Sequence, residues 1–503
     1  MKDSLMTQSL ASKLECRPHP ALKPWVVFCL GMVSTSVLSA CTDSVPIPSN
    51  LTQDPTLQPN EPLLSSLVYT GCAKPSSAPP IHTYYVDPAR GNISNDGSQA
   101  HPWSTLSEVV TSKKLATIVK SGDTVYLRNG DQGVVNLKNL VNTDFITVAA
   151  DQGQTPVLQG LEVNGSSKWN FQGLTVQGVL TTPSNTMSLV NIGKSTDVIF
   201  TQGTLRSQAD VSAWTKQNWR DQATSGILAR ESSCITFSRN TLLNVRAAIR
   251  MWADKALVSG NTIDTFSFDG IDYLPGDGIQ IVGNTIKNSV DSCEPPPNVP
   301  PATVCPHQDG IQGQFIYNDP SKLGQNVLIA RNRIVVQSRP DLKFPSGGLQ
   351  GITAFDGNWK NVTIVNNTAI INAYHAITMG GATNGLIANN TVLNTNPTRN
   401  AWIVVGGTHQ GFTSSNVTVR NNIANQIKNT TDAATNLVVD HNLATKDPSA
   451  VFTAFDPSQA VFDLHLKIGS PAIGAGSAER APVTDIEGKK RSVPLDEGAY
   501  AYP

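Results

Sequence analysis

The sequence predicts an all-β protein: a right-handed single-stranded parallel β-helix with an N-terminal helical cap and a C-terminal closing segment. Three observations carry this prediction. Short strands of alternating apolar residues recur along the chain, an asparagine follows each of them, and charged residues make up only 15% of the 503 residues. Apolar residues still make up 39%, which is enough to fill a long core and argues against disorder.

The recurring asparagine indicates a structural repeat. Seven such asparagines are 21, 23, 48, 35, 23 and 32 residues apart. About 22 residues suit one coil of a three-sided β-helix, and the longer gaps indicate coils with inserted loops. Asparagine favours turns, and stacked amides can hydrogen-bond from one coil to the next. The seven residues are Asn240, Asn261, Asn284, Asn332, Asn367, Asn390 and Asn422.

Each strand before an asparagine alternates in the way that one buried face requires, as in residues 362–364 and 417–419. Less regular coils lie upstream, at residues 169–171 and 198–200. A β-sandwich or a propeller is the alternative. The short, nearly constant period and the missing hairpin signals favour stacked coils instead.

The N-terminus is typical of an export signal. A basic region ends at Lys23, and an apolar stretch over residues 25–38 is short for a membrane span. Leu38-Ser39-Ala40-Cys41 resembles a bacterial lipobox, which predicts a signal peptide over residues 1–40 and lipidation of Cys41. Thr42 after that cysteine favours the outer membrane or the cell surface. The alternative is an ordinary signal peptide cut after Ala40, which leaves the protein periplasmic or secreted.

The rest of the chain divides into four parts. Residues 42–80 are rich in Pro, Ser and Thr and predict a flexible tether. Residues 81–150 contain a helical stretch at about 104–120, followed by a strand at 121–127, which predicts a cap and the first coils. Further coils occupy 151–445, and a closing segment occupies 446–503.

Export permits disulfides among the remaining cysteines. Cys293 and Cys305 bracket a Pro-rich loop, and we expect them to be bonded, because the bond would constrain that loop. Cys234 precedes an apolar strand and is interpreted as a buried thiol. No tight Cys/His pairing occurs, so metal binding by these cysteines is not expected.

A second column of strands begins eight or more residues after the asparagines. In each strand an isoleucine follows a small residue and precedes a further residue that is polar. We expect the isoleucines to point inward and both neighbours outward, so that the small residues floor a shallow groove. The five segments are residues 248–250, 270–272, 310–312, 351–353 and 376–378.

Polar residues concentrate along this column. Asp269 and Asp309 fall in consecutive coils, where stacked strands are about 4.8 Å apart, and Asp272 lies on the same ridge. Like charges this close raise at least one pKa or recruit a cation. The alternatives are turn roles for the aspartates and ordinary surface roles for the others. The predicted site comprises Arg250, Asp269, Asp272, His307, Asp309, Gln312, Gln350 and His375.

The helical stretch with the segment 121–130, the coils, and the closing segment from residue 470 onward together resemble the pectate-lyase-like superfamily of secreted bacterial β-helix proteins, over about residues 81–503. The resemblance implies an enzyme that acts on an extracellular, uronate-containing polysaccharide by β-elimination or by C5 epimerisation. Such chemistry needs a cation at the uronate carboxylate, a base for the α-proton and an acid for the leaving oxygen.

The roles follow from that chemistry. His307 or Lys343 would be the base, Arg250 would contact the carboxylate, and Asp309 and Asp272 would complete the catalytic set. Oxygen ligands suit Ca²⁺, which predicts a calcium site. The metal ligands would be Asp269, Asp272 and Asp309, and the substrate-binding residues would be Gln312, Gln350 and His375.

Two other functions stay open. Paired aspartates could serve a glycoside hydrolase, although the Asn-Thr-Asp and Gly-His-Gly patterns of polygalacturonase-like β-helices are missing. A non-catalytic surface protein that binds carbohydrate is the third reading, because a fold does not fix a function. The net charge of −1 indicates no nucleic-acid partner. The expected partners are the polysaccharide and, through the lipid anchor only, a membrane; the chain is expected to be a monomer.

Overall fold

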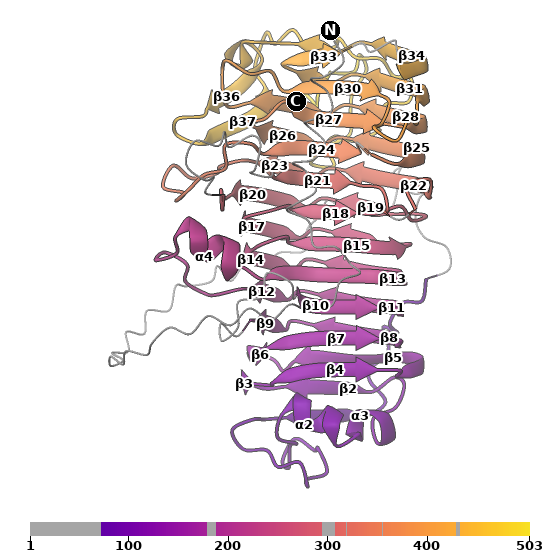
Figure 1. Ribbon diagram of the computed structural model, residues 1–503, viewed down its shortest axis with the longest axis vertical. Helices are drawn as coiled ribbons and strands as arrows, with labels where there is room; N and C mark the ends of the chain where they lie inside the picture. Colours follow the sequence, from indigo (N-terminus) through magenta and orange to yellow (C-terminus); the bar gives the residue numbers. More distant parts are fainter. Residues whose placement is uncertain (1–71, 179–187, 294–306, 318, 355, 429–432) are drawn as a thin grey trace, which may run out of the picture. The chain divides into compact units, whose positions relative to one another are not determined.

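The computed structural model confirms an all-β fold of stacked parallel coils (Figure 1). The described residues belong to one compact unit. The predicted signal peptide and Cys41 lie outside them, as does Cys305. The structure describes residues 72–178, 188–293, 307–317, 319–354, 356–428 and 433–503.

Each coil contributes a strand to three parallel columns. The first and second columns are joined by the long strand β13, whose two halves pair with both. The first column contains β4 (Val134–Lys138), β7 (Gly160–Asn164), β10 (Ser188–Gly193), β13 (Ser225–Ser238), β15 (Ile249–Asp254), β18 (Ile271–Tyr273), β21 (Asp309–Gly313), β24 (Gln350–Ala354), β27 (His375–Gly380), β30 (Trp402–Gly406) and β33 (Gln426–Lys428).

The second and third columns complete each coil. The second contains β1 (Thr83–Val86), β2 (Thr124–Leu127), β5 (Val141–Ala150), β8 (Ser167–Gln172), β11 (Thr196–Thr201), β16 (Leu257–Ser259), β19 (Gln280–Val282), β22 (Leu323–Ala330), β25 (Asn358–Val365), β28 (Ala382–Ala388), β31 (Ser414–Arg420) and β34 (Ala434–Asp440). The third contains β3 (Gly130–Asp131), β6 (Pro156–Leu158), β9 (Thr175–Gln177), β12 (Thr204–Arg206), β14 (Thr241–Val245), β17 (Thr262–Phe266), β20 (Thr285–Ser289), β23 (Arg333–Val335), β26 (Thr368–Ile371), β29 (Thr391–Asn394), β32 (Ile423–Ala424) and β35 (Leu443–Ala444).

The core is a continuous apolar column inside the coils. Residues of one register stack on each other, so Ile249, Ile271 and Ile311 are aligned on consecutive strands and are fully buried. Alternation along each strand places these residues inside, as the sequence predicts. Burial of apolar side chains is the main favourable contribution to folding, at about 25 cal/mol per Å².

The predicted asparagine ladder is present between the second and third columns. Each side-chain amide donates to the Oδ1 atom of the next asparagine at 2.9–3.0 Å. The backbone N–H of each donates to the same Oδ1 atom. Asn442 extends the ladder by one coil beyond the seven predicted members. These buried amides are therefore satisfied by one another and fix how each coil sits on the next.

The helical cap differs from the single helix expected over residues 104–120. Two short helices form, α2 (Leu106–Thr111) and α3 (Lys114–Thr117), because Lys113 adopts a left-handed conformation with φ of 63°. Their apolar residues join the main core at the end of the stack, below β2 in Figure 1. Among the described residues, no helix has the length and apolarity to cross a membrane.

Inserted and terminal segments pack on the outside of the coils. Helix α4 (Lys216–Asp221) carries Trp219, which packs with Trp214 and Leu342. The 3-10 helix η2 (Pro448–Ala450) and the hairpin of β36 (Phe452–Asp456) and β37 (Val461–Leu466) bury an outer apolar patch of the third column.

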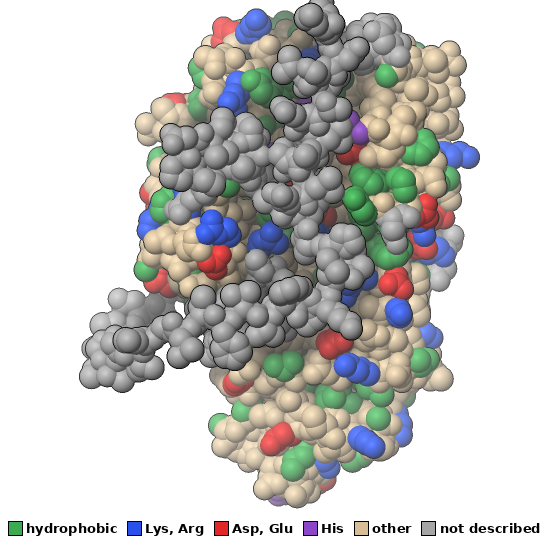
Figure 2. Space-filling model, viewed as in Figure 1, with side chains coloured by type: hydrophobic (Ala, Val, Ile, Leu, Met, Phe, Trp, Pro, Cys, Tyr) green, Lys and Arg blue, Asp and Glu red, His purple; other side chains and the backbone are tan. Residues whose placement is uncertain are grey.

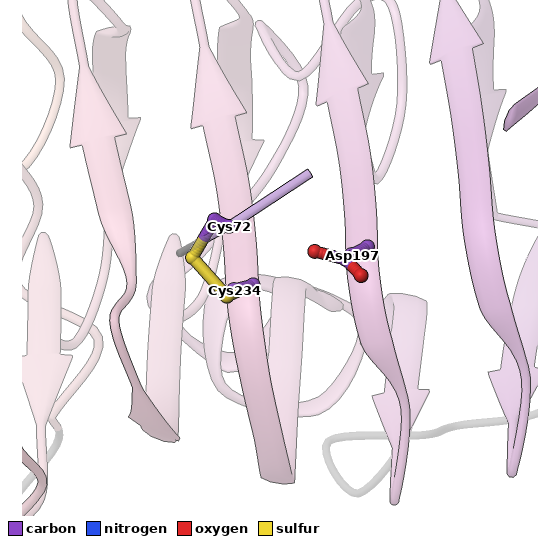
Figure 3. Close-up of side chains that lie close together, drawn as sticks. All are labelled: Cys72, Asp197 and Cys234. Atoms are coloured by element: carbon purple, nitrogen blue, oxygen red, sulfur yellow. A yellow bond between two sulfur atoms is a disulfide. The ribbon is translucent and has the colours of Figure 1, made fainter. Parts of the chain in front are cut away.

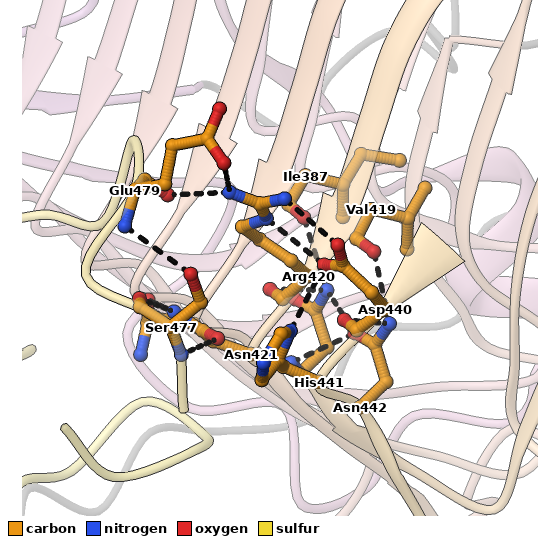
Figure 4. A network of polar contacts seen from close by, with 11 residues as sticks. Ile387, Val419, Arg420, Asn421, Asp440, His441, Asn442, Ser477 and Glu479 are labelled. Carbon is orange, nitrogen blue, oxygen red and sulfur yellow. Dashed lines mark hydrogen bonds and ion pairs between the residues drawn. The ribbon is translucent and has the colours of Figure 1, made fainter. Parts of the chain in front are cut away.

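Residues 477–479 of the closing segment are held by a polar network (Figure 4). The guanidinium of Arg420 contacts both carboxylate oxygens of Asp440 at 2.8 and 3.0 Å, and it contacts Glu479 at 2.8 Å. Asn421 donates to the carbonyl of Ser477 at 2.8 Å. The last coils and the closing segment are therefore joined by charge-assisted hydrogen bonds.

The interpretation of Cys234 as a free thiol is wrong. Cys234 forms a disulfide with Cys72, 162 residues earlier, with the Cα atoms 5.4 Å apart (Figure 3). The backbone N–H of Ala73 also donates to Asp197 at 3.0 Å. The chain at residue 72 is therefore covalently attached to the middle of the coils. Cys293 is disulfide-bonded as well, while the predicted pairing with Cys305 involves a residue outside the described part.

We predict that Asn332→Ala destabilises the fold strongly, because it removes the side chain that bonds both Asn284 and Asn367. Leaving buried polar groups unpaired costs about 1–3 kcal/mol each, so the free energy of unfolding should fall by at least about 3 kcal/mol. Chemical denaturation measures it. The control is Asn136→Ala, at an exposed strand position. Equal, small losses for both variants would contradict a structural role for the ladder.

Candidate functional site

The column of small residue, isoleucine and polar residue that the sequence predicts corresponds to the first column of strands in the structure. This column lies on the face that Figure 1 presents to the viewer. Its register confirms the predicted alignment of the residues that follow the isoleucines. Those residues are Arg250, Asp272, Gln312, Thr353 and Thr378.

The prediction that the small residues floor a groove is wrong. A Cβ atom on Gly270 would lie 2.5 Å from the carbonyl oxygen of Gly310 and 2.8 Å from Ile286, a core residue. Gly310 is likewise packed against Ile334 of the core. These positions are small because the next coil and the interior leave no room for a side chain.

Three carboxylates gather on the outer side of β18 and β21, as predicted. Asp269, Asp272 and Asp309 are each buried, with at most 3% of their surface exposed. The backbone N–H of Asp309 donates to Asp269 at 2.9 Å. Burial, followed by the negative charges of Asp272 and Asp309, raises the pKa of Asp269 well above its ordinary value of 3.8.

An arginine pair lies beside this cluster. Arg250 donates twice to Asp272, at 2.7 and 2.8 Å, and the charge of Asp272 raises the pKa of Arg250. Arg246 was not predicted. Its guanidinium lies 4.7 Å from the ring centroid of Phe268, and that of Arg250 lies 5.9 Å from the same ring.

Both Arg246 and Phe268 stand three residues before an isoleucine of the column, so the same alignment extended into the turn would have found them.

His307 is positioned by Asp309. One ring nitrogen, Nδ1, lies 3.0 Å from the Oδ2 atom of Asp309, and Thr353 donates to the other oxygen at 3.2 Å. The side chain of His307 is 41% exposed, whereas that of Asp309 is 1% exposed. A buried carboxylate therefore orients an imidazole that solvent can reach.

The predicted substrate-binding residues continue along the column. Gln312 accepts a hydrogen bond from Gln314, and Gln350 pairs in register with Asp309. His375 contacts Thr378 at 2.9 Å, and the indole N–H of Trp402 donates to it at 3.1 Å. Trp402 was not predicted, because its coil breaks the small-residue pattern at a register shift.

Lys343 is not brought to the carboxylates by any contact among the described residues. Its ammonium donates to the carbonyl of Ser212 at 3.2 Å and lies over the ring of Phe344. Ser212 lies just before α4, and Phe344 packs in the apolar cluster that contains Trp219 of α4. The structure therefore supports His307 rather than Lys343 as the group beside the aspartates.

The predicted calcium ligands do not have the closest metal-ligand geometry in the structure. In the described part of the chain, one group of three His, Cys, Asp or Glu side chains has ligand atoms within 4.8 Å of one another: Cys72, Asp197 and Cys234. Its two sulfurs are bonded to each other, which removes them as thiolate ligands (Figure 3). The three buried aspartates do not form such a group, and Arg250 already contacts Asp272. Ca²⁺ binding stays a prediction, and no reaction step is assigned to it.

A cavity lies where the first and second columns meet, between strands such as β15 and β11. Its volume is about 590 Å³, and its lining includes Trp252, Lys194 and Glu231. Three of its serine hydroxyls, those of Ser166, Ser195 and Ser232, donate to the backbone carbonyl two residues earlier in their own turns. These three hydroxyls therefore stabilise the turns.

Comparison with known proteins gives structural likenesses only. No family model and no curated protein matches the chain. A rhamnogalacturonan lyase is 14% identical, with 82% of this chain and 96% of that chain covered and a TM-score of 0.44. A pectate lyase is 16% identical, with 86% and 98% covered and a TM-score of 0.40. An alginate lyase from Paenibacillus sp. str. FPU-7 is 14% identical, with 72% and 99% covered and a TM-score of 0.31. The fold assignment rests on the strand register above, and these likenesses add no argument about activity.

We predict that Asp269→Asn stabilises the protein at neutral and alkaline pH. A raised pKa means that the folded state holds the proton more tightly than the unfolded state. The contribution of Asp269 to stability is therefore full below about pH 4 and is lost as the pH rises toward the folded pKa. The amide still accepts the bond from Asp309 and carries no charge.

Thermal unfolding of parent and variant at pH 5 and pH 8 checks this expectation. The variant should gain on the order of 1 kcal/mol relative to the parent at the higher pH, since one pKa unit corresponds to about 1.4 kcal/mol. A pH-independent difference between the two proteins would show that Asp269 is not the titrating group.

Proposed function

We propose that the chain cleaves a uronate-containing polysaccharide by β-elimination. One observation carries this proposal. Two exposed groups of complementary chemistry, the imidazole of His307 and the guanidinium of Arg250, stand on neighbouring parts of one column, and a buried carboxylate holds each of them. The side chain of Arg250 is 40% exposed and that of Asp272 only 4%.

The chemistry divides between these groups. Arg250 and Arg246 bind the uronate carboxylate, and their charge increases the acidity of the neighbouring C–H bond. With Asp309 accepting the proton on Nδ1, the Nε2 atom of His307 carries the lone pair and takes the α-proton. The C–H electrons form the double bond as the glycosidic C–O bond breaks. The leaving oxygen takes a proton from the imidazolium or from water.

The burial of the carboxylates favours elimination over hydrolysis. A glycoside hydrolase needs two carboxyl groups that flank the scissile bond. Asp269, Asp272 and Asp309 are buried and serve neighbouring protein groups. C5 epimerisation uses the same proton removal and differs in returning the proton to the carbon.

The same proposal places the protein outside the cytoplasm, as an exported monomer attached to the outer membrane through Cys41. The disulfide between Cys72 and Cys234 supports export, because such bonds persist in oxidising compartments. On the face drawn in Figure 2, the Lys and Arg side chains of the described residues are scattered and do not form a basic patch, which is consistent with a partner other than nucleic acid.

The proposal predicts that the purified chain generates an ultraviolet-absorbing unsaturated sugar from uronate polymers. His307→Ala should lower kcat about 10²–10⁴-fold with little change in KM, because a positioned base contributes about that factor. A continuous absorbance assay measures both constants. The matched control is His409→Ala, which removes an exposed histidine paired with Asp356 at 3.1 Å, beyond the C-terminal ends of β24 and β30.

New reducing ends without ultraviolet absorbance would instead identify a hydrolase. Full elimination activity in His307→Ala would refute the assignment of the base.

A second prediction concerns the carboxylate-binding arginine. Arg250→Gln should raise KM for a uronate polymer by about tenfold or more, since charge-assisted bidentate contacts are worth about 1.5–3 kcal/mol. Arg250→Lys should recover part of the loss, because a lysine keeps the charge without the planar fork. Steady-state kinetics at several salt concentrations provide the comparison. Unchanged KM in Arg250→Gln would mean that the substrate carboxylate binds elsewhere.

A further inference from the structure

A cation–aromatic stack, formed by Arg399, Tyr374, Trp402 and Lys428, lies three strands beyond the His307–Asp309 pair. The rings of Tyr374 and Trp402 are stacked with centroids 5.1 Å apart. The guanidinium of Arg399 lies 5.3 Å from the Tyr374 centroid, and the ammonium of Lys428 lies 3.1 Å from the Trp402 centroid. Each cation is therefore held against a π face.

The stack belongs to the same column as the candidate active site. Lys428 is aligned with Arg250 through the register of successive strands. The aligned residues between them are Asp272, Gln312, Thr353, Thr378 and Val404. Trp402 is tied to the column by its bond to His375. Three strand spacings separate β21 from β30, which corresponds to about 14 Å. A linear polymer that runs across the strands would contact both the His307–Asp309 pair and the stack.

Neither cation of the stack forms an ion pair with an Asp or Glu among the described residues, in contrast to Arg250 and Arg420. Arg399 donates to the carbonyl of Asn372 at 3.1 Å, which fixes its position without neutralising it. Tyr374 is 44% exposed, so solvent and ligands reach the stack. The stack thus offers two positive charges on an accessible aromatic surface.

We propose that this stack is a second subsite for an anionic sugar, in which Lys428 and Arg399 bind a carboxylate of the same polymer chain. The identity of the polymer rests on the proposed function, whereas binding at the stack can be tested without catalysis. A carboxylate-bearing sugar matches both features, since its charge meets the cations and its apolar C–H groups pack on exposed aromatic edges.

Binding is measured with the full chain carrying His307→Ala, so that the polymer stays intact. The probes are polygalacturonate and alginate, with dextran as a neutral polymer, and retardation in polymer-containing native gels gives the affinity. Lys428→Gln should weaken binding of at least one anionic polymer about fivefold, which corresponds to about 1 kcal/mol for a partly exposed cation. Lys428→Arg should retain most of the affinity.

The matched control is Lys360→Gln, an exposed lysine on β25 in the second column. Trp402→Phe keeps an aromatic face and should weaken binding less than Lys428→Gln does. Equal affinities of Lys428→Gln and its parent, or no binding of either anionic polymer by the parent, would overturn the subsite.

Kinetics of the active chain separate this inference from the proposed function. Lys428→Gln should raise KM for a long polymer and leave kcat unchanged, because the stack lies away from the reacting bond. Elimination activity with an unaltered KM in Lys428→Gln would support the proposed function and contradict the subsite. Binding that depends on Lys428, without any elimination, would retain the subsite and reject the function.

Discussion

Hydrogen bonds between stacked asparagine amides set the register on which the rest of the structure depends. Each amide satisfies the next inside the turn, so a coil cannot slip along its neighbour without leaving buried polar groups unpaired. This constraint survives long insertions. Asn284 and Asn332 are 48 residues apart and still bond at 2.9 Å, and Asp272 consequently aligns with Gln312 across an insertion that includes residues outside the described part.

The fixed register explains how one column can hold three carboxylates close together although their negative charges repel one another. Asp269, Asp272 and Asp309 are forced together by strand spacing, and the electrostatic cost appears as the raised pKa of Asp269. Part of that cost is offset by Arg250 and by the backbone N–H of Asp309. Buried acids that orient an exposed base and an exposed cation are a common way to prepare reactive groups in advance of substrate binding.

Periodic features of the sequence predicted the fold and the alignment of the site, because each reflects a contact that repeats in every coil. Contacts that occur at only one place in the fold were not predicted. The bond between Cys72 and Cys234 joins residues 162 positions apart, and no local pattern indicates such a pair. Arg246 and Phe268 lie in the turns just before the aligned strands, and the predicted alignment did not include these turns. The glycines of the column were interpreted as the floor of an outer groove. Close packing against the next coil and the core instead explains why these positions have no side chain.

Proton removal from the carbon next to the uronate carboxylate is the central claim, and proton NMR of a uronate polymer incubated with the full chain in D₂O tests it most directly. The account predicts a growing vinyl signal from the unsaturated sugar and its loss in a variant lacking the imidazole of His307. Deuterium incorporation without a vinyl signal would indicate epimerisation. A polymer that is cut with neither a vinyl signal nor deuterium incorporation would contradict the account.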